Sequence, residues 1–290
     1  MNRRVTFLGP KGATFSDVAY HRLAVEYGAP IGEEADYQTV AANPQVIDAI
    51  MQHGGFGAIA METAAQGRVA EPLEAFIALL GKYDNSTRPF SVIRALKMKL
   101  SLCLMARAGV TLSQVTGVVA HPKALGACKD NVSRLSIPTR EATSNGEAAR
   151  MVAQDSGFGT WAALGPVSAA EKFGLNVVAD AYEDATAVTT FFLLGPNACG
   201  RVIGEQNRAL IVFRTDDKTG ALVRALEPWE KRGLNLMQIH SVHVNKGTYD
   251  FAIEVEVEQS RISSFNEALR EFERAVVKHI TFGPFQVLSE

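Results

Sequence analysis

An apolar strand that carries two adjacent hydroxyl groups is the clearest chemical signal in this chain. Residues 186–195 read T-A-V-T-T-F-F-L-L-G, and Val188–Leu194 has the apolar character of a buried strand. Thr189 and Thr190 lie within it, and a buried hydroxyl costs free energy unless something binds it. We therefore expect a site to open at this strand, although threonine is also simply a good strand former.

Two segments combine a strand–helix junction with hydroxyl or amide side chains. The turn Gly9–Gly12 follows an apolar strand and leads into Thr14 and Ser16, and Ser144 and Asn145 stand at the start of another helix. Helix N-termini expose unpaired backbone N–H groups and a positive dipole end, which suits a carboxylate or another anion. An ordinary strand–helix turn explains the first segment as well, so the residues alone leave both interpretations open.

Glu62 and His121 could also take part in chemistry. Glu62 and Thr63 follow the strand Phe56–Met61, and ligands in open α/β sheets bind at the carboxyl ends of strands. His121 precedes Pro122 at a helix start and could face a cleft. The alternatives are a cap or salt bridge for Glu62 and a capping or packing role for His121.

Composition narrows the classes of function. The 290 residues are 47% hydrophobic and 21% charged with a net charge of −2, which suits about two domains and gives no basic surface for nucleic acid or an anionic membrane. No apolar run approaches the ~20 residues that span a bilayer. Three scattered cysteines predict reduced thiols in the cytoplasm. His240 and His243 would lie on opposite faces of a strand, so that pair alone does not predict a metal site. We expect neither a metal nor a cofactor.

Residues 1–202 alternate between strand and helix patterns, which favours an α/β domain with largely parallel sheets. The predicted strands are Arg4–Leu8, Phe56–Met61, Lys99–Arg107, Gly117–Ala120, Trp161–Leu164, Val177–Ala179 and Val188–Leu194. The predicted helices are Ser16–Tyr27 with Ser16 as N-cap, Asn43–His53, Ala70–Leu80, Pro122–Leu135, Asn145–Ala153 and Val167–Phe173.

A short linker at residues 203–206 leads to a second module, residues 207–290, in which strand and helix patterns follow the order βαββαβ of a ferredoxin-like fold. Its predicted strands are Arg208–Arg214, Leu234–Val244, Thr248–Glu258 and Ile280–Leu288, and its predicted helices are Thr219–Arg232 and Arg261–Arg274. Pro228 lies inside the first helix, so we expect a kink or a break there.

These segments resemble, in order and over nearly the whole chain, the motifs of the prephenate dehydratase family. Residues 9–16 resemble Gly-Pro-x-Gly-Thr-Phe-Ser with Ala13 inserted, and residues 60–67 resemble Pro-Ile-Glu-Asn-Ser-x-x-Gly through Glu62 and Gly67. Residues 120–125 resemble Ser-His-Pro-Gln-Ala-Leu, and residues 143–149 resemble Ser-Thr-x-Glu-Ala-Ala with one extra residue. The strand at residues 189–195 resembles the family's Thr-Arg-Phe strand, with Thr190 in place of the arginine.

The resemblance implies an architecture and an activity. Residues 1–202 would form a two-lobed catalytic domain like a periplasmic binding protein, with the chain crossing between lobes near residues 95–100 and 182–188. The substrate would be prephenate, which loses CO2 and water to give phenylpyruvate. Thr189 and Glu62 would be catalytic, and the substrate-binding residues would be Thr14, Ser16, Thr63, His121, Ser144, Asn145, Thr190 and Phe191.

Thr190 cannot supply the two-pronged guanidinium of the family's arginine. Either Lys11, Lys123 or the helix N-termini at Ser16 and Asn145 take its place, or the site decarboxylates prephenate without aromatising the ring. A third alternative is a non-catalytic sensor of small molecules.

Residues 218–223, K-T-G-A-L-V, resemble the Gly-Ala-Leu turn of amino-acid-binding ACT domains, so residues 207–290 would be an ACT-like regulatory domain. Gly220, Ala221, Leu222 and Ser241 would form its allosteric site. The family's Glu-Ser-Arg-Pro stands here as H-S-V-H, residues 240–243, which leaves open whether phenylalanine, another amino acid or no effector binds. ACT-like modules pair side by side, so we expect a homodimer or homotetramer.

Overall fold

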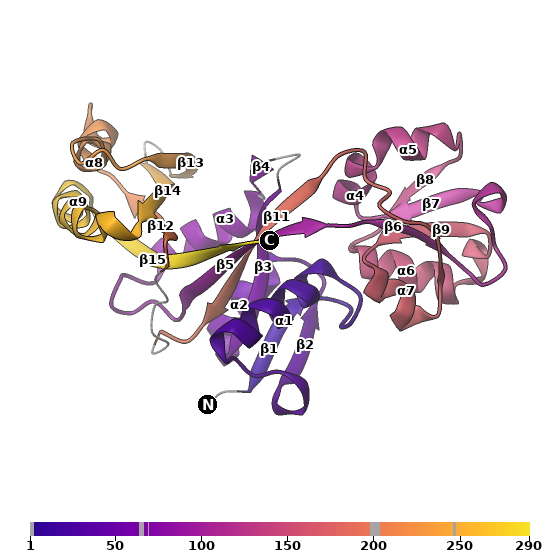
Figure 1. Cartoon of the computed structure of the whole chain (residues 1–290). Helices are drawn as coiled ribbons and strands as arrows, with labels where there is room; N and C mark the ends of the chain where they lie inside the picture. Colours follow the sequence, from indigo (N-terminus) through magenta and orange to yellow (C-terminus); the bar gives the residue numbers. More distant parts are fainter. Residues whose placement is uncertain (1–2, 64–66, 69, 198–203, 246–247) are drawn as a thin grey trace.

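The chain folds into two lobes and a C-terminal module; in Figure 1 the C-terminal module lies at the left, the first lobe in the middle and the second lobe at the right. This computed structural model describes residues 3–63, 67–68, 70–197, 204–245 and 248–290. The predicted boundary at residue 202 and part of the predicted linker lie outside the described residues. Among the described helices, none is long and apolar enough to cross a membrane.

The first lobe is built on the central strands of a mixed sheet. Its strands are β1 (Arg4–Leu8), β2 (Asp36–Val40), β3 (Phe56–Thr63), β4 (Gly67–Arg68), β5 (Ser91–Leu100) and β11 (Ala187–Gly195). Their order is β5-β11-β3-β1-β2, with β4 paired to β3. The strands β1, β2 and β3 run parallel, whereas β11 is antiparallel to both β3 and β5.

Three helices cover this sheet: α1 (Phe15–Tyr27), α2 (Pro44–His53) and α3 (Ala70–Ala78). On one face, Tyr20 and Leu23 of α1 pack with Phe7 and Phe191. On the other face, residues of α2 and α3 form a second apolar cluster. With both faces covered, the strand ends are left as the open edge from which polar side chains reach solvent.

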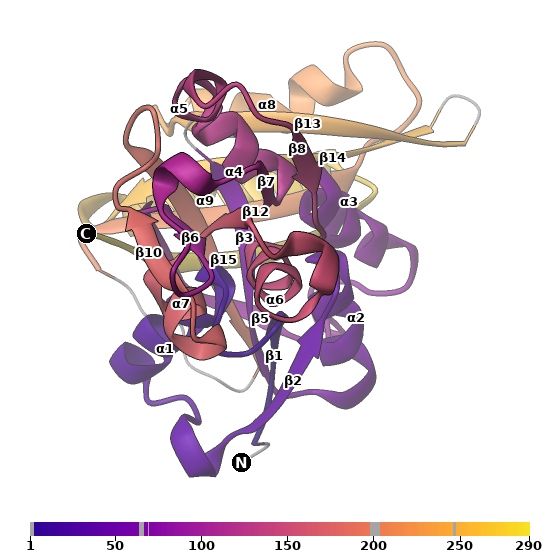
Figure 2. The same ribbon diagram turned by 90° about the vertical axis from the view of Figure 1, so that its right-hand side faces the viewer.

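The second lobe is a separate five-stranded sheet, shown from its outer side in Figure 2. Its strands, in the order β10-β6-β9-β7-β8, are β10 (Asn176–Ala179), β6 (Cys103–Ala106), β9 (Trp161–Gly165), β7 (Gly117–Ala120) and β8 (Thr139–Glu141). Its helices are α4 (Pro122–Ala127), α5 (Lys129–Arg134), α6 (Asn145–Gln154) and α7 (Val167–Phe173). The chain enters this lobe after β5 and leaves it before β11, so two short connections join the lobes.

The C-terminal module has the predicted βαββαβ order. It contains β12 (Gln206–Arg214), α8 (Ala221–Glu230), β13 (Leu236–Asn245), β14 (Thr248–Glu258), α9 (Ile262–Ala275) and β15 (Lys278–Ser289). The last strand, β15, pairs in parallel with β5 of the first lobe, so that one ten-stranded sheet passes through both units. Phe76 and Phe282 meet edge to face at 4.9 Å across this junction and belong to one shared core cluster.

The structure corrects several expectations about the elements. The sheets are mixed rather than largely parallel. The strand β5 leads into the second lobe and β11 leads back from it, so these two strands run antiparallel to each other. The predicted strand Lys99–Arg107 is divided between β5 and β6, and the predicted helix Pro122–Leu135 is divided between α4 and α5. Thr14, not Ser16, caps α1, and α8 runs through Pro228 and ends two residues later.

Candidate active site

A cavity of about 540 Å³ is lined by residues of both lobes. Thr14, Phe15 and Ser16 come from the start of α1, Thr63 from β3, and Thr189 and Phe191 from β11. The other lobe contributes His121, Lys123, Ser144 and Asn145 from the junctions that lead into α4 and α6. This volume suits a small organic ligand, and the wall combines apolar side chains with a few convergent polar groups.

The strand β11 presents Thr189 and Thr190 in opposite directions. Thr189 pairs in register with Thr63, and both residues line the cavity. Thr190 pairs with Glu62 instead, is 4% exposed and does not line the cavity. Because side chains alternate along a strand, the two hydroxyls cannot share one site. The structure thus places Thr190, one of the predicted substrate-binding residues, outside the cavity lining, and an arginine at this position would leave from the face opposite the cavity.

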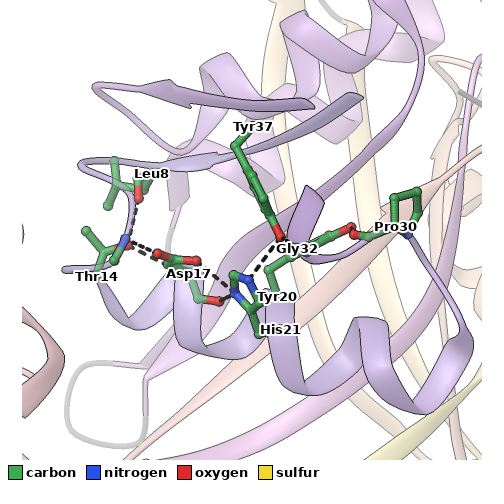
Figure 3. Close-up of polar contacts among 9 residues, drawn as sticks. Leu8, Thr14, Asp17, Tyr20, His21, Pro30, Gly32 and Tyr37 are labelled. Atoms are coloured by element: carbon green, nitrogen blue, oxygen red, sulfur yellow. Dashed lines mark hydrogen bonds and ion pairs between the residues drawn. The ribbon is translucent and has the colours of Figure 1, made fainter. Parts of the chain in front are cut away.

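Hydrogen bonds to Thr14 and Asp17 hold the turn before α1 in place (Figure 3). The Thr14 hydroxyl donates to the Leu8 carbonyl at 2.7 Å and accepts the Asp17 N–H at 3.2 Å, and the Asp17 carboxylate accepts the Gly12 N–H. The bond from the Asp17 N–H satisfies one helix N-terminal donor, and the other two fix the turn to the end of β1 and to α1. The inserted Ala13 is fully buried and leaves Thr14 and Ser16 on the cavity wall.

Asp17 also binds the imidazole of His21, as Figure 3 shows. Asp17 Oδ1 lies 2.9 Å from His21 Nδ1, and His21 Nε2 lies 3.1 Å from the Tyr37 hydroxyl. The hydrogen bond to Asp17 raises the pKa of His21, against the lowering effect of its partial burial. Lys11 lies over the other partner, with its ammonium 3.8 Å from the centre of the Tyr37 ring, and does not line the cavity.

The start of α6 is tied to the turn of the first lobe. The Ser144 hydroxyl donates to the Gly9 carbonyl at 2.8 Å and accepts the Glu147 N–H at 3.0 Å. Gly146 leaves room for this approach, since a Cβ built there would lie 2.6 Å from Pro10 Cδ. The second lobe thus closes the cavity by direct contact with the first.

His121 is fixed as a neutral imidazole at the start of α4. Its ring Nδ1 accepts the backbone N–H of Lys123 at 3.2 Å, and the backbone N–H of His121 donates to Asn145 Oδ1 at 3.1 Å. Burial, followed by the nearby Lys123 ammonium, lowers the pKa of His121. With Nδ1 acting as acceptor, the ring proton resides on Nε2, which leaves a hydrogen-bond donor at the cavity.

Two polar residues on the cavity wall were missed from the sequence. Asn43 precedes Pro44 at the start of α2, but its side chain makes no capping bond and its buried Oδ1 has no hydrogen-bond partner within the described structure. Glu71 lies in the first turn of α3. The Asn-Pro pair at a helix start was the available signal for Asn43, whereas nothing local distinguishes Glu71 from a solvated helix residue.

Glu62 does not line the cavity, contrary to the expectation of a catalytic role. Its carboxylate lies 3.3 Å from Arg208 NH1 on β12, and the same nitrogen lies 3.3 Å from Glu254 on β14. The side chains of Arg208 and Glu254 are 6% and 2% exposed. The Glu62 side chain is itself 37% exposed, so Glu62 forms a partly buried ionic contact between the first lobe and the C-terminal module.

A smaller hollow of about 210 Å³ lies in the C-terminal module, where the end of β12 leads into α8. Gly220, Ala221 and Leu222 line it together with Tyr249 and Phe251. Gly220 has φ 78°, a conformation that glycine adopts without strain. Ser241 is exposed on β13 and does not line this hollow, so the predicted allosteric residues are only partly brought together. No cluster of three His, Cys, Asp or Glu side chains suited to a metal occurs within the described part of the chain.

The family model for prephenate dehydratase matches residues 5–199, which covers both lobes and the cavity between them. The chain belongs to the prephenate dehydratase family. A relative from Corynebacterium glutamicum, named prephenate dehydratase, is 30% identical over 260 residues, which are 87% of this chain and 78% of that protein.

Solved structures share the fold over both lobes and the C-terminal module. Prephenate dehydratase from Arthrobacter aurescens, solved in complex with L-Phe, superposes with a TM-score of 0.80 at 23% identity and covers 98% of this chain and 89% of that one. GqqA, described as a novel type of quorum quenching acylase, superposes with a TM-score of 0.78 at 20% identity and covers 99% of this chain and 98% of that one. At these identities the likeness concerns the fold.

Proposed function

We propose that this protein is a lyase that converts prephenate to phenylpyruvate with loss of CO2 and water. The observation that carries the proposal is the position of Thr189, which lines the cavity within the region that matches the prephenate dehydratase family. The cavity also offers hydroxyl and amide groups at the starts of α1 and α6, where a carboxylate is electrostatically favoured.

The reaction needs no external oxidant or reductant. The bond between the ring and its carboxylate breaks, CO2 leaves, and the electron pair enters the ring. The ring hydroxyl then departs from the opposite carbon, takes a proton and leaves as water, while the ring becomes aromatic. Thr189 is proposed to hydrogen-bond the departing oxygen, where negative charge develops. The neutral His121 offers a further N–H donor on the same wall.

Apolar side chains support the decarboxylation half of the reaction. Phe15, Leu100 and Phe191 line the cavity beside the polar groups. A carboxylate is stabilised by water more than the CO2 that it becomes, so a wall that excludes water favours release. The ring of the substrate is proposed to lie against this apolar part and the polar tail against the helix starts.

Product analysis tests the proposal directly. Purified protein is incubated with prephenate and the products are identified by mass spectrometry, with boiled protein as the control for the acid-catalysed reaction. Phenylpyruvate is the expected product. A non-aromatic decarboxylated product would instead establish the decarboxylase alternative, and unchanged prephenate that binds tightly would establish a sensor.

The hollow in the C-terminal module is the proposed site of an amino-acid effector. Its support is the placement of Gly220, Ala221 and Leu222 on its wall and the L-Phe complex of the Arthrobacter aurescens structure. Calorimetric titration with L-Phe and with other amino acids tests it. A Gly220→Val variant, strained at φ 78°, is expected to lose the binding.

A further inference from the structure

The cavity needs a cation if its substrate is a dicarboxylate, and the described residues of the first lobe that line it include no Lys or Arg. Position 190 faces away from the cavity, and Lys11 lies over the Tyr37 ring outside it. Among the lining residues, the charged side chains are Glu71 and Lys123, with His121 neutral. Lys123 is thus the one Lys or Arg on the described wall.

Lys123 has the properties of a binding residue rather than a structural one. It is the second residue of α4 and half-buried, and its ammonium has no hydrogen bond or ion pair within 4 Å in the described structure. Burial lowers the pKa of Lys123, and the Glu71 carboxylate opposes this. A half-buried ammonium with three unused donors gains strongly from a carboxylate that enters the cavity.

The chemistry of the reaction decides which carboxylate suits this ammonium. The ring carboxylate loses its charge when it becomes CO2, so a cation bound to it would stabilise the substrate more than the transition state. The carboxylate of the pyruvyl side chain keeps its charge throughout. A cation there holds the substrate in place without opposing the reaction.

Resting on the proposed function, we propose that the Lys123 ammonium binds the pyruvyl carboxylate of the substrate and is the cationic anchor that position 190, which faces away from the cavity, does not supply. The Glu71 carboxylate, which lines the same cavity, attracts this ammonium in the empty site and competes with the substrate for it. Lys123 is therefore a determinant of specificity for 2-keto acids with a free carboxylate.

Phenylpyruvate tests this assignment because it retains the pyruvyl carboxylate and lacks the ring carboxylate. Its Kd is measured by calorimetry for the wild type, Lys123→Gln, Lys123→Arg and the control Lys11→Gln, alongside KM and kcat for prephenate. For Lys123→Gln we expect the Kd and the KM to rise together by about tenfold or more, the loss of one charge-assisted pair, with kcat unchanged. Lys123→Arg keeps the charge and should retain most of the affinity, and Lys11→Gln should match the wild type.

Two outcomes overturn the proposal. An unchanged phenylpyruvate Kd in Lys123→Gln, with an unchanged KM, would remove Lys123 from binding. A raised KM with an unchanged phenylpyruvate Kd would assign Lys123 to the ring carboxylate. The calorimetric arm does not depend on turnover, so a wild type that binds phenylpyruvate through Lys123 but leaves prephenate intact would refute the proposed function and not this assignment. Circular dichroism of each variant verifies the fold.

Discussion

Arg208, on the first strand of the C-terminal module, forms a 3.3 Å ion pair with Glu62, on the strand next to β11. Glu62 immediately precedes Thr63, which lines the cavity. The contact therefore joins the module to the wall of the candidate active site through a single buried guanidinium. It also explains how Glu62 keeps a cationic neighbour although the residue opposite it in register, Thr190, is uncharged.

Replacing Arg208 by methionine should reduce both stability and substrate affinity. The change leaves the 2% exposed side chain of Glu254 without this cation, and breaking a buried pair in this way costs about 3 kcal/mol. Urea denaturation measures the loss, and a Glu254→Gln change in the same chain should recover part of it. We also expect a higher KM for prephenate, because β3 loses its tether beside Thr63.

Arg214 provides the matched control for this prediction. It lies on the same strand and pairs with Asp250 at 2.6 Å, inside the C-terminal module. Arg214→Met should lower stability and leave the KM as in the wild type. Equal KM values for the two variants would contradict a link between Arg208 and the cavity.

Thr189 and Thr190 form a natural pair for testing the catalytic hydroxyl. Both are buried threonines on one strand, and valine has nearly the same shape as threonine. Thr189→Val should lower kcat by about 10²- to 10³-fold, as the loss of one hydrogen bond to developing charge does. Thr190→Val removes a hydroxyl on the opposite face and should keep the wild-type kcat. Steady-state assays with prephenate compare them, and similar losses in both variants would argue against a specific role for Thr189.

The sequence pattern was sufficient to predict a strand or helix where local chemistry determines that element. The strand Thr248–Glu258 follows from its alternation, and the helix Val167–Phe173 from the glycine that ends it in a left-handed conformation. The strand Ser91–Leu100 could not be found in this way, because Arg94 and Lys97 interrupt its apolar pattern. Arg94 is nonetheless buried, with Glu26 of α1 at 3.8 Å.

The candidate site was predictable only as a set of strand and helix ends. The helix starts at Thr14 and Ser144 follow from local capping chemistry, and both line the cavity. Alternation shows that Thr189 and Thr190 face opposite ways, but which of them faces the ligand depends on the other lobe. The role of Glu62 depends on Arg208, which lies 146 residues later and reaches it only through the folded module.

Gly146 should be required for closure of the two lobes. A Cβ at this position would lie 2.6 Å from Pro10 Cδ and 2.9 Å from the Ala13 carbonyl, whereas alanine inside an unobstructed helix would stabilise it. We expect Gly146→Ala to lower the free energy of unfolding by about 1–3 kcal/mol and to raise the KM, since Ser144 and Asn145 are displaced from the first lobe.

Gly157 supplies the control for Gly146. It is exposed in the same lobe, and a Cβ there meets nothing within 4 Å. Gly157→Ala should change stability by no more than about 0.5 kcal/mol and leave the KM unaltered. If Gly146→Ala behaved in the same way, the close approach of the lobes would not matter for either property.

His121 should make the stability of the protein depend on pH. Burial lowers the pKa of His121 in the folded chain, so below its unfolded value of about 6.5 the unfolded chain binds more protons than the folded one. The stabilisation that comes from the neutral His121 ring is then fully present above about pH 6.5, and it is lost as the pH falls toward the lower pKa of the folded chain. Protonation of Nδ1 also removes the acceptor of the Lys123 N–H at the start of α4. Glu71 and Glu141 partly oppose the shift, and Lys123 adds to it.

A His121→Asn variant separates this effect from that of the other histidines. Asparagine can accept the same N–H as a helix cap but does not titrate. His21 and His279 remain in both proteins, so their contributions cancel in the difference between them. Urea denaturation across this range should show a constant difference in unfolding free energy above about pH 6.5 and a relative gain for the variant below it. A difference that stays constant throughout would mean that His121 titrates alike in the folded and unfolded chain.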